Sequence, residues 1–285
     1  QNALNFLNSA NELAPHSAQT LSNLGLVHNA ILDFQSALEC FDLAINSNPN
    51  IPEAHNNRGN ALKGLNKNQD AIKAYQQALL LRPDYAEALS NFGVMILEEG
   101  SPQRAIPLFE KALSANPNLA VAFNNLGNAL TQLDLYQDAF QCFERALQIN
   151  NQYLDACLNF GNCLKRAKQI SAAIDCYQHA LKINPNHAYT YYLLGEIYYD
   201  TGDADLAKTY LAKALDLDPK NIEAQFALAI SQIPKVYRSK EELQASRSAF
   251  ASQLNTLEGI AVEKEAPVKI ESILGKHPFY LAYQD

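Results

Sequence analysis

The sequence predicts an all-α solenoid, and five recurring columns of residues carry that prediction. Glycine recurs six times at intervals of 34 residues, at Gly25, Gly59, Gly93, Gly127, Gly161 and Gly195. When each repeat is numbered so that this glycine is position 8, alanine occupies positions 20 and 27 in all six repeats. Position 24 holds a large residue, in turn Phe41, Tyr75, Phe109, Phe143, Tyr177 and Leu211. Position 32 is proline in five of the six repeats, with Asn151 as the exception.

The small and large columns have a packing explanation. Two helices packed at about 8–10 Å axis separation leave no room for a large side chain where they cross, which explains positions 8, 20 and 27. The large residue at position 24 fills the space that the small residues leave. Proline at position 32 cannot continue a helix, so it ends the second helix of each repeat. Since one helix pair cannot bury both of its faces, each repeat is expected to be stable only against its neighbours.

This 34-residue pattern resembles the tetratricopeptide repeat, a pair of antiparallel helices. The resemblance covers about four-fifths of the chain and implies a right-handed superhelix with a long concave face. Six full repeats are expected over residues 18–221. Residues 1–17 match the second helix of a truncated repeat, and residues 222–233 match the first helix of a partial seventh repeat.

The segment after the repeats loses the 34-residue period. Ser239 and Glu242 form a capping-box pattern ahead of an amphipathic stretch, so residues 234–258 are expected to be a capping or junction helix that ends by Gly259. Residues 259–285 are expected to be a linker and the start of a following domain, with a strand-like run near the end. Both ends of the chain look cut, which predicts a longer parent protein.

The same segment carries a second resemblance, to the junction of bacterial SPINDLY-like proteins, which are similar to O-linked N-acetylglucosamine transferases. Three stretches carry it: Ile233-Pro234-Lys235-Val236-Tyr237-Arg238-Ser239-Lys240-Glu241-Glu242, the helix with Arg247 and Phe250, and His277-Pro278-Phe279-Tyr280-Leu281-Ala282-Tyr283-Gln284. The resemblance implies a parent that transfers a sugar from a nucleotide-sugar donor to Ser or Thr of a protein. Its catalytic lobes would follow Asp285, so no catalytic residue and no cofactor are assigned to this chain.

Composition and charge narrow the function classes. A net charge of −8 and a pI near 5.3 argue against nucleic acid, whose phosphates attract a basic stripe. No apolar stretch approaches the ~18 residues of a membrane span, and the expected location is cytoplasmic.

Cys40, Cys142 and Cys176 all occupy position 23, where they fit as small packing residues rather than as metal ligands. No catalytic spacing or phosphate-binding motif is found, so an enzyme complete within these residues is not expected.

A column of asparagines indicates the binding face. In this architecture the first helix of each repeat lines the concave face through positions 2, 5, 6, 9, 12 and 13. Position 6 is asparagine in five repeats, at Asn23, Asn57, Asn91, Asn125 and Asn159. Position 9 adds Asn60, Asn128 and Asn162. Asparagine is a mediocre helix former, so nothing local favours it there.

Carboxamide chemistry favours a polypeptide partner. Each carboxamide offers an acceptor and two donors, which can pair with the C=O and the N–H of one peptide unit. Successive repeats place these groups about 10 Å apart, or roughly three residues of extended chain. The asparagines are therefore predicted to hold an extended polypeptide by its backbone, at about 0.5–1.5 kcal/mol per hydrogen bond. In the alternative interpretation, they bond to one another or to neighbouring helices and only solvate the groove.

Charges and aromatic residues refine this prediction. Positions 2, 5, 6 and 9 contain no Lys or Arg in the six repeats, and position 2 carries three acids. The groove should therefore prefer neutral or basic segments to a carboxylate tail. Tyr189, Tyr192 and Tyr199 gather in the sixth repeat. They are interpreted as packing for the segment that follows, with binding anchors as the alternative.

Two functions compete on this basis. The first is the acceptor-recognition arm of a protein O-glycosyltransferase, and the second is a stand-alone protein-interaction scaffold whose tail caps the solenoid. A homodimer through a convex apolar patch is a further expectation, to which no residues are assigned.

Overall fold

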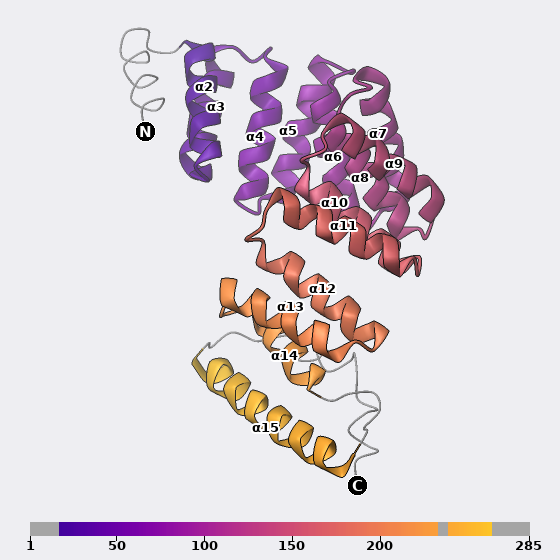
Figure 1. The fold of residues 1–285 in the computed structure, drawn as a ribbon. Helices are drawn as coiled ribbons and strands as arrows, with labels where there is room; N and C mark the ends of the chain where they lie inside the picture. The colour runs from indigo at the N-terminus through magenta and orange to yellow at the C-terminus, as the bar shows by residue number, and fades with distance from the viewer. Residues whose placement is uncertain (1–16, 233–238, 264–285) are drawn as a thin grey trace. The chain divides into compact units, whose positions relative to one another are not determined.

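The computed structural model describes residues 17–232 and 239–263 of the chain, and every regular element in them is a helix (Figure 1). The first helices of successive repeats are α2 (Ala18–Ala30), α4 (Pro52–Gly64), α6 (Ala86–Glu98), α8 (Ala120–Gln132), α10 (Leu154–Arg166), α12 (Ala188–Thr201) and α14 (Ile222–Ser231). The second helices are α3 (Phe34–Ser47), α5 (Asn68–Leu81), α7 (Pro102–Ala115), α9 (Tyr136–Ile149), α11 (Ile170–Ile183) and α13 (Ala204–Leu217). These pairs confirm the predicted all-α solenoid.

The chain divides into two units, residues 1–156 and 157–285, with the boundary inside α10. In the first unit three second helices pack against the first helix of the next repeat: α3 on α4, α5 on α6 and α7 on α8. In the second unit α11 to α14 follow the same scheme. Contact between neighbouring repeats buries the face that a single helix pair leaves open.

The small and large columns pack against each other as predicted. A Cβ added at Gly59 would lie 2.5 Å from the ring of Tyr75, and one at Gly93 would lie 2.6 Å from the ring of Phe109. Both rings are fully buried, as is every alanine at positions 20 and 27. Position 8 is glycine because the position-24 ring occupies the space that a Cβ would need.

The turn between the two helices of each repeat holds a feature that the sequence columns did not reveal. Position 15 has a positive φ in all six repeats, at Leu32, Asn66, Gly100, Asp134, Lys168 and Gly202. Only two of these residues are glycine. Asparagine and aspartate tolerate this left-handed conformation, whereas other side chains are strained in it by about 1–2 kcal/mol. The repeat geometry therefore imposes a backbone conformation that the residue types alone do not predict.

The last described helix, α15 (Lys240–Glu263), differs from its expected bounds. It continues through Gly259 into the expected linker, because one interior glycine costs only about 1 kcal/mol relative to alanine and no proline follows until Pro267. Phe250 of α15 packs beside a buried cluster formed by Tyr199, Ala207 and Ile230. The helix thus covers the end of the repeats.

Some expectations lie outside the described residues. They concern the truncated repeat over residues 1–16, the junction run at 233–238, and the tail at 264–285 with its strand-like segment. None of the described helices combines the length and the apolar character that a bilayer-spanning segment needs.

Candidate functional site

The position-6 asparagines lie near the middle of the first helices, and all five are half-buried. The first four belong to the first unit, at Asn23 on α2, Asn57 on α4, Asn91 on α6 and Asn125 on α8. Asn159, on α10, belongs to the second unit with Asn162. Each group is therefore described within its own unit.

A cavity of about 520 Å³ brings several of these side chains together in the first unit. Carboxamides from three consecutive repeats line it, those of Asn60, Asn91 and Asn125. Apolar side chains contribute as well, among them Val94 and Val121. The predicted binding column is thus part of a concave surface with both polar and apolar character. Asn23, Asn57 and Asn128 do not line this cavity.

The carboxamides are joined by hydrogen bonds that run from one repeat to the one before it. Nδ2 of Asn91 donates to Oδ1 of Asn56 at 2.9 Å and to Oδ1 of Asn60 at 3.2 Å. Nδ2 of Asn125 donates to Oγ of Ser90 at 3.4 Å. Position 6 therefore links to position 5 of the preceding repeat in both cases. The bonds of the alternative interpretation are present, and part of the asparagine column serves to hold adjacent repeats together.

Tyrosine hydroxyls from the second helices reach the position-9 asparagines. The hydroxyl of Tyr75 donates to Oδ1 of Asn60 at 2.9 Å, and that of Tyr177 donates to Oδ1 of Asn162 at 2.7 Å. Sequence reasoning missed this contact because it treated position 24 only as a packing position. The available signal was that position 24 is tyrosine only in the second and fifth repeats, and both have asparagine at position 9.

Charged side chains at both ends of α4 are paired. Glu53 accepts from Arg82 at 2.6 Å, and Lys63 donates to Glu98 at 2.7 Å. Burial raises the pKa of Glu53, but a backbone hydrogen bond and Arg82 outweigh it, so the net pKa is lowered and the carboxylate stays ionised. Glu87 is exposed at position 2 of the third repeat. Lys63, which lines the cavity, is paired with Glu98, and Glu87 leaves an exposed negative charge on α6.

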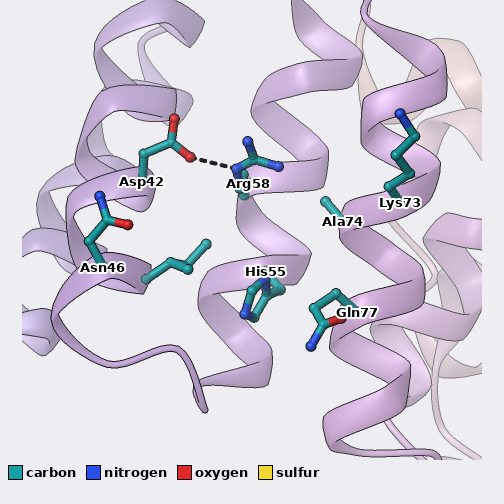
Figure 2. A pocket seen from close by; sticks show the side chains of 8 residues that line it. Asp42, Asn46, His55, Arg58, Lys73, Ala74 and Gln77 are labelled. Carbon is teal, nitrogen blue, oxygen red and sulfur yellow. Dashed lines mark hydrogen bonds and ion pairs between the residues drawn. The ribbon is translucent and has the colours of Figure 1, made fainter.

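A second cavity, of about 460 Å³, lies in the first unit between α3, α4 and α5 (Figure 2). Asp42 and Arg58 form an ion pair on one side of it at 2.5 Å, and Lys73 and Gln77 extend from α5 on the other. His55 lies at its floor, where Nε2 bonds the carbonyl of Pro49 at 2.9 Å. Arg58 is paired with Asp42, and Lys73 is paired with Asp70 at 3.1 Å, so the charged side chains of this cavity do not converge on one point.

The tyrosines of the sixth repeat divide between the two roles considered for them. Tyr199 is buried in the cluster beneath α15, and Tyr192 is buried with its hydroxyl donating to Glu196 at 2.6 Å. Tyr189 stacks on Tyr192, with ring centroids 5.8 Å apart, and is 43% exposed. Packing accounts for two of the three rings, and Tyr189 alone offers a face to a partner.

The cysteines behave as packing residues. No disulfide joins the five, all of which lie in the described part of the chain. Burial raises the pKa of Cys142 and of Cys157 to about 11 and that of Cys176 to about 12, so these thiols stay protonated at neutral pH. Over residues 17–232 and 239–263, no cluster of three metal-ligating side chains is found.

Comparison with protein-family models identifies the repeats. Models described as tetratricopeptide repeat match residues 56–120, 120–153 and 188–221, and a model described as TPR repeat matches residues 161–202. The matches fall in both units, and those over 120–153 and 188–221 each span one repeat in the register set by the glycine column. The chain is a tetratricopeptide repeat protein.

Solved structures share this architecture. A chain of the APC/C hetero-tetramer Cut9–Hcn1 aligns with a TM-score of 0.74 at 20% identity, over 81% of this chain and 46% of that one, so this chain spans less than half its length. PilW, a type IV pilus biogenesis factor, aligns with a TM-score of 0.69 at 23% identity, over 74% and 98% of the two chains. At these identities the likeness shows the fold alone.

YrrB is more similar in sequence. It aligns with a TM-score of 0.51 at 28% identity, over 67% of this chain and 98% of its own, and is described as a TPR protein with an unusual peptide-binding site. No curated protein was found to match the chain.

Proposed function

We propose that this protein binds extended polypeptide segments along the first-helix face of its repeats. The observation that carries the proposal is the cavity of about 520 Å³ in which carboxamides from three consecutive repeats meet apolar side chains. The contact residues are expected to be the ladder asparagines and their position-9 neighbours, namely Asn23, Asn57, Asn91, Asn125, Asn159, Asn60, Asn128 and Asn162.

The chemistry of the cavity fits a backbone-directed contact. Carboxamides supply both donors and acceptors, so they can satisfy the polar groups of an extended chain that has lost its water. Val94 and Val121 offer surface for apolar side chains of the bound segment. The exposed Glu87 and the absence of Lys and Arg from positions 2, 5, 6 and 9 favour neutral or basic segments. A peptide-binding site in YrrB, which has the same fold, supports this choice.

The test begins with a random 15-residue peptide library selected on the full chain. The triple variant Asn57→Ala, Asn91→Ala, Asn125→Ala should bind the selected peptide at least about 10-fold more weakly, since three hydrogen bonds of about 0.5–1.5 kcal/mol are lost. Its thermal transition should also fall, because Asn91 and Asn125 bond to the preceding repeat. Circular dichroism at the assay temperature establishes that the variant is folded when binding is measured.

The matched control lies at the second cavity. The variant Lys73→Ala, Gln77→Ala changes two side chains of that cavity and should leave the Kd unchanged. A folded triple variant that binds as tightly as the original chain would overturn the proposal.

A finer proposal concerns the parent protein. The junction resemblance and the asparagine column support an acceptor-recognition arm of a protein O-glycosyltransferase that works in the cytoplasm with a nucleotide-sugar donor. The longer gene product, assayed with UDP-N-acetylglucosamine and with GDP-fucose on a cell-lysate proteome, should transfer sugar only when the repeats are present. No transfer with either donor, together with peptide binding by the repeats, favours the stand-alone scaffold.

Sedimentation of the 285-residue chain measures whether a homodimer forms.

A further inference from the structure

A tyrosine and three asparagines form a connected network at the cavity of the first unit. Oδ1 of Asn60 accepts from the Tyr75 hydroxyl at 2.9 Å and from Nδ2 of Asn91 at 3.2 Å. Nδ2 of Asn91 also donates to Oδ1 of Asn56 at 2.9 Å. Tyr75 is fully buried, whereas Asn60 and Asn91 are half-buried and line the cavity. The network therefore runs from the core to the concave surface.

Counting donors and acceptors shows what this network leaves for a ligand. A carboxamide oxygen accepts two hydrogen bonds and a carboxamide nitrogen donates two. Both acceptor sites of Asn60 and both donor sites of Asn91 are used inside the protein. The groups that have no partner in the described part of the chain are the Nδ2 of Asn60 and the Oδ1 of Asn91. Asn91 therefore cannot donate to a carbonyl of a bound segment without breaking one of its links to the second repeat.

We propose, on the basis of the proposed peptide-binding function, that Asn60 and Asn91 together bind the C=O and the N–H of one residue of the extended segment, and that Tyr75 is the positioning residue that holds the Asn60 side chain. In an extended chain these two groups of one residue point to the same side. Nδ2 of Asn60 donates to the carbonyl of the bound segment, and Oδ1 of Asn91 accepts its N–H. Turning the Asn60 amide over would place its nitrogen against the nitrogen of Asn91, a donor facing a donor. The donor of Asn91 therefore opposes that turn, and the Tyr75 hydroxyl fixes the position of the Asn60 oxygen.

The hydroxyl of Tyr75 is protonated at neutral pH. Burial raises the pKa of Tyr75 well above its usual value, and the charge of Glu98 adds to this effect. The hydroxyl therefore keeps its proton and can donate to Asn60 at neutral pH.

The chain contains a second example and a natural comparison. In the second unit Tyr177 donates to Asn162 at 2.7 Å, so position 24 orients position 9 there too. In the fourth repeat Phe143 stands opposite Asn128 at the same positions. Phenylalanine at position 24 is thus compatible with asparagine at position 9 and with a folded repeat, which makes Tyr75→Phe a mild change.

The arrangement specifies a feature of the partner. The bound segment must present a secondary amide at the point where its N–H meets Asn91. Proline and N-methylated residues lack that hydrogen, so they are excluded at one position of the segment and tolerated at its neighbours.

The experiment uses the full chain and the peptide selected from the random 15-residue library. Tyr75→Phe should raise its Kd about 3- to 10-fold, the effect of one hydrogen bond. In an Asn60→Ala background the same change should add nothing, because Tyr75 acts through Asn60. A scan with N-methylated peptides should show one position whose methylation weakens binding to the original chain. The Tyr136→Phe control, at the first residue of α9 where the hydroxyl donates to Asp134 at 2.5 Å, should bind normally.

The outcomes separate this inference from the proposed function. If the asparagine triple variant loses binding but Tyr75→Phe keeps the original Kd, peptide binding stands and the role of Tyr75 is rejected. A weakening by Tyr75→Phe that is equally large in the Asn60→Ala background indicates a general loss of structure and also rejects it. If the triple variant binds normally, both proposals fail together.

Discussion

At the scale of the residue, asparagine at position 6 combines two tasks. Asn91 and Asn125 donate hydrogen bonds to the preceding repeat and also line the cavity. A half-buried amide can do both because it has more hydrogen-bonding sites than one neighbour can use. Mutating such a residue therefore changes stability and binding together, and only the comparison of variants separates the two effects.

The left-handed turn offers a test of residue-scale strain. Leu32 has a φ of 62° and its side chain is 73% exposed, so it loses little packing when it is removed. Leu32→Gly should raise the free energy of unfolding by about 0.5–1 kcal/mol, because relief of the strain exceeds the added entropy of the unfolded chain. Urea unfolding measures the change.

The reverse substitution at the same repeat position is the control. Gly202 has a φ of 92°, and nothing lies near an added Cβ. Gly202→Ala should therefore lower the free energy of unfolding by about 1 kcal/mol through backbone strain alone. If Leu32→Gly destabilised the protein, strain at position 15 would not be the dominant effect.

At the scale of the element, side chains at position 4 fasten the turn between repeats. His55 bonds the carbonyl of Pro49 at 2.9 Å, and Gln225 bonds that of Pro219 at 2.6 Å. In the sixth repeat the Tyr191 hydroxyl donates to the Pro185 carbonyl at 3.1 Å. Three different residue types thus satisfy the same backbone oxygen, which explains why no column was visible at position 4.

The end of the solenoid gives a prediction for α15. Phe250 packs on the cluster that contains Tyr199 and Ile230, so Phe250→Ala should lower the free energy of unfolding by about 1–3 kcal/mol through lost apolar burial. Gln244→Ala, at an exposed position of the same helix, should change it by less than about 0.5 kcal/mol. Equal effects of the two changes, measured by urea unfolding, would show that α15 does not cap the repeats.

At the scale of the whole molecule, the buried thiols and phenols make stability sensitive to high pH. Burial raises the pKa of Cys142 and Cys157 to about 11 and that of Cys176 to about 12, whereas a thiol usually has a pKa of 9.0. Burial also raises the pKa of the Tyr177 phenol. The unfolded chain loses these thiol protons near pH 9 while the folded chain keeps them. The free energy of unfolding should therefore be fully present below about pH 9 and fall as the pH rises toward 11–12.

Urea unfolding at a series of pH values between about 7.5 and 11 measures this dependence. The double variant Cys142→Ala, Cys176→Ala should show a shallower fall, because two of the shifted groups are gone. A free energy of unfolding that increased through this range would contradict the assignment.

The glycine and alanine columns were enough to predict the repeats and their helix pairs. They repeat because every helix crossing meets the same steric limit, which is why Gly59 and its equivalents are predictable from spacing alone. The asparagine column was visible because it recurs at the same 34-residue interval. The sequence could not show that the side-chain nitrogen of Asn91 donates to both Asn56 and Asn60, because these hydrogen bonds depend on how closely two repeats approach.

The sequence by itself thus determined the period, the helix pairs, the buried columns and the face that carries the asparagines, since these follow from local spacing and steric exclusion. Only the tertiary structure decided which carboxamide groups are consumed inside the protein and which face the cavity. It also decided that position 15 is left-handed and that the Tyr75 hydroxyl reaches Asn60. Hydrogen-bond partners and turn conformations depend on atoms brought together by packing, and a sequence pattern records residue types without recording those distances.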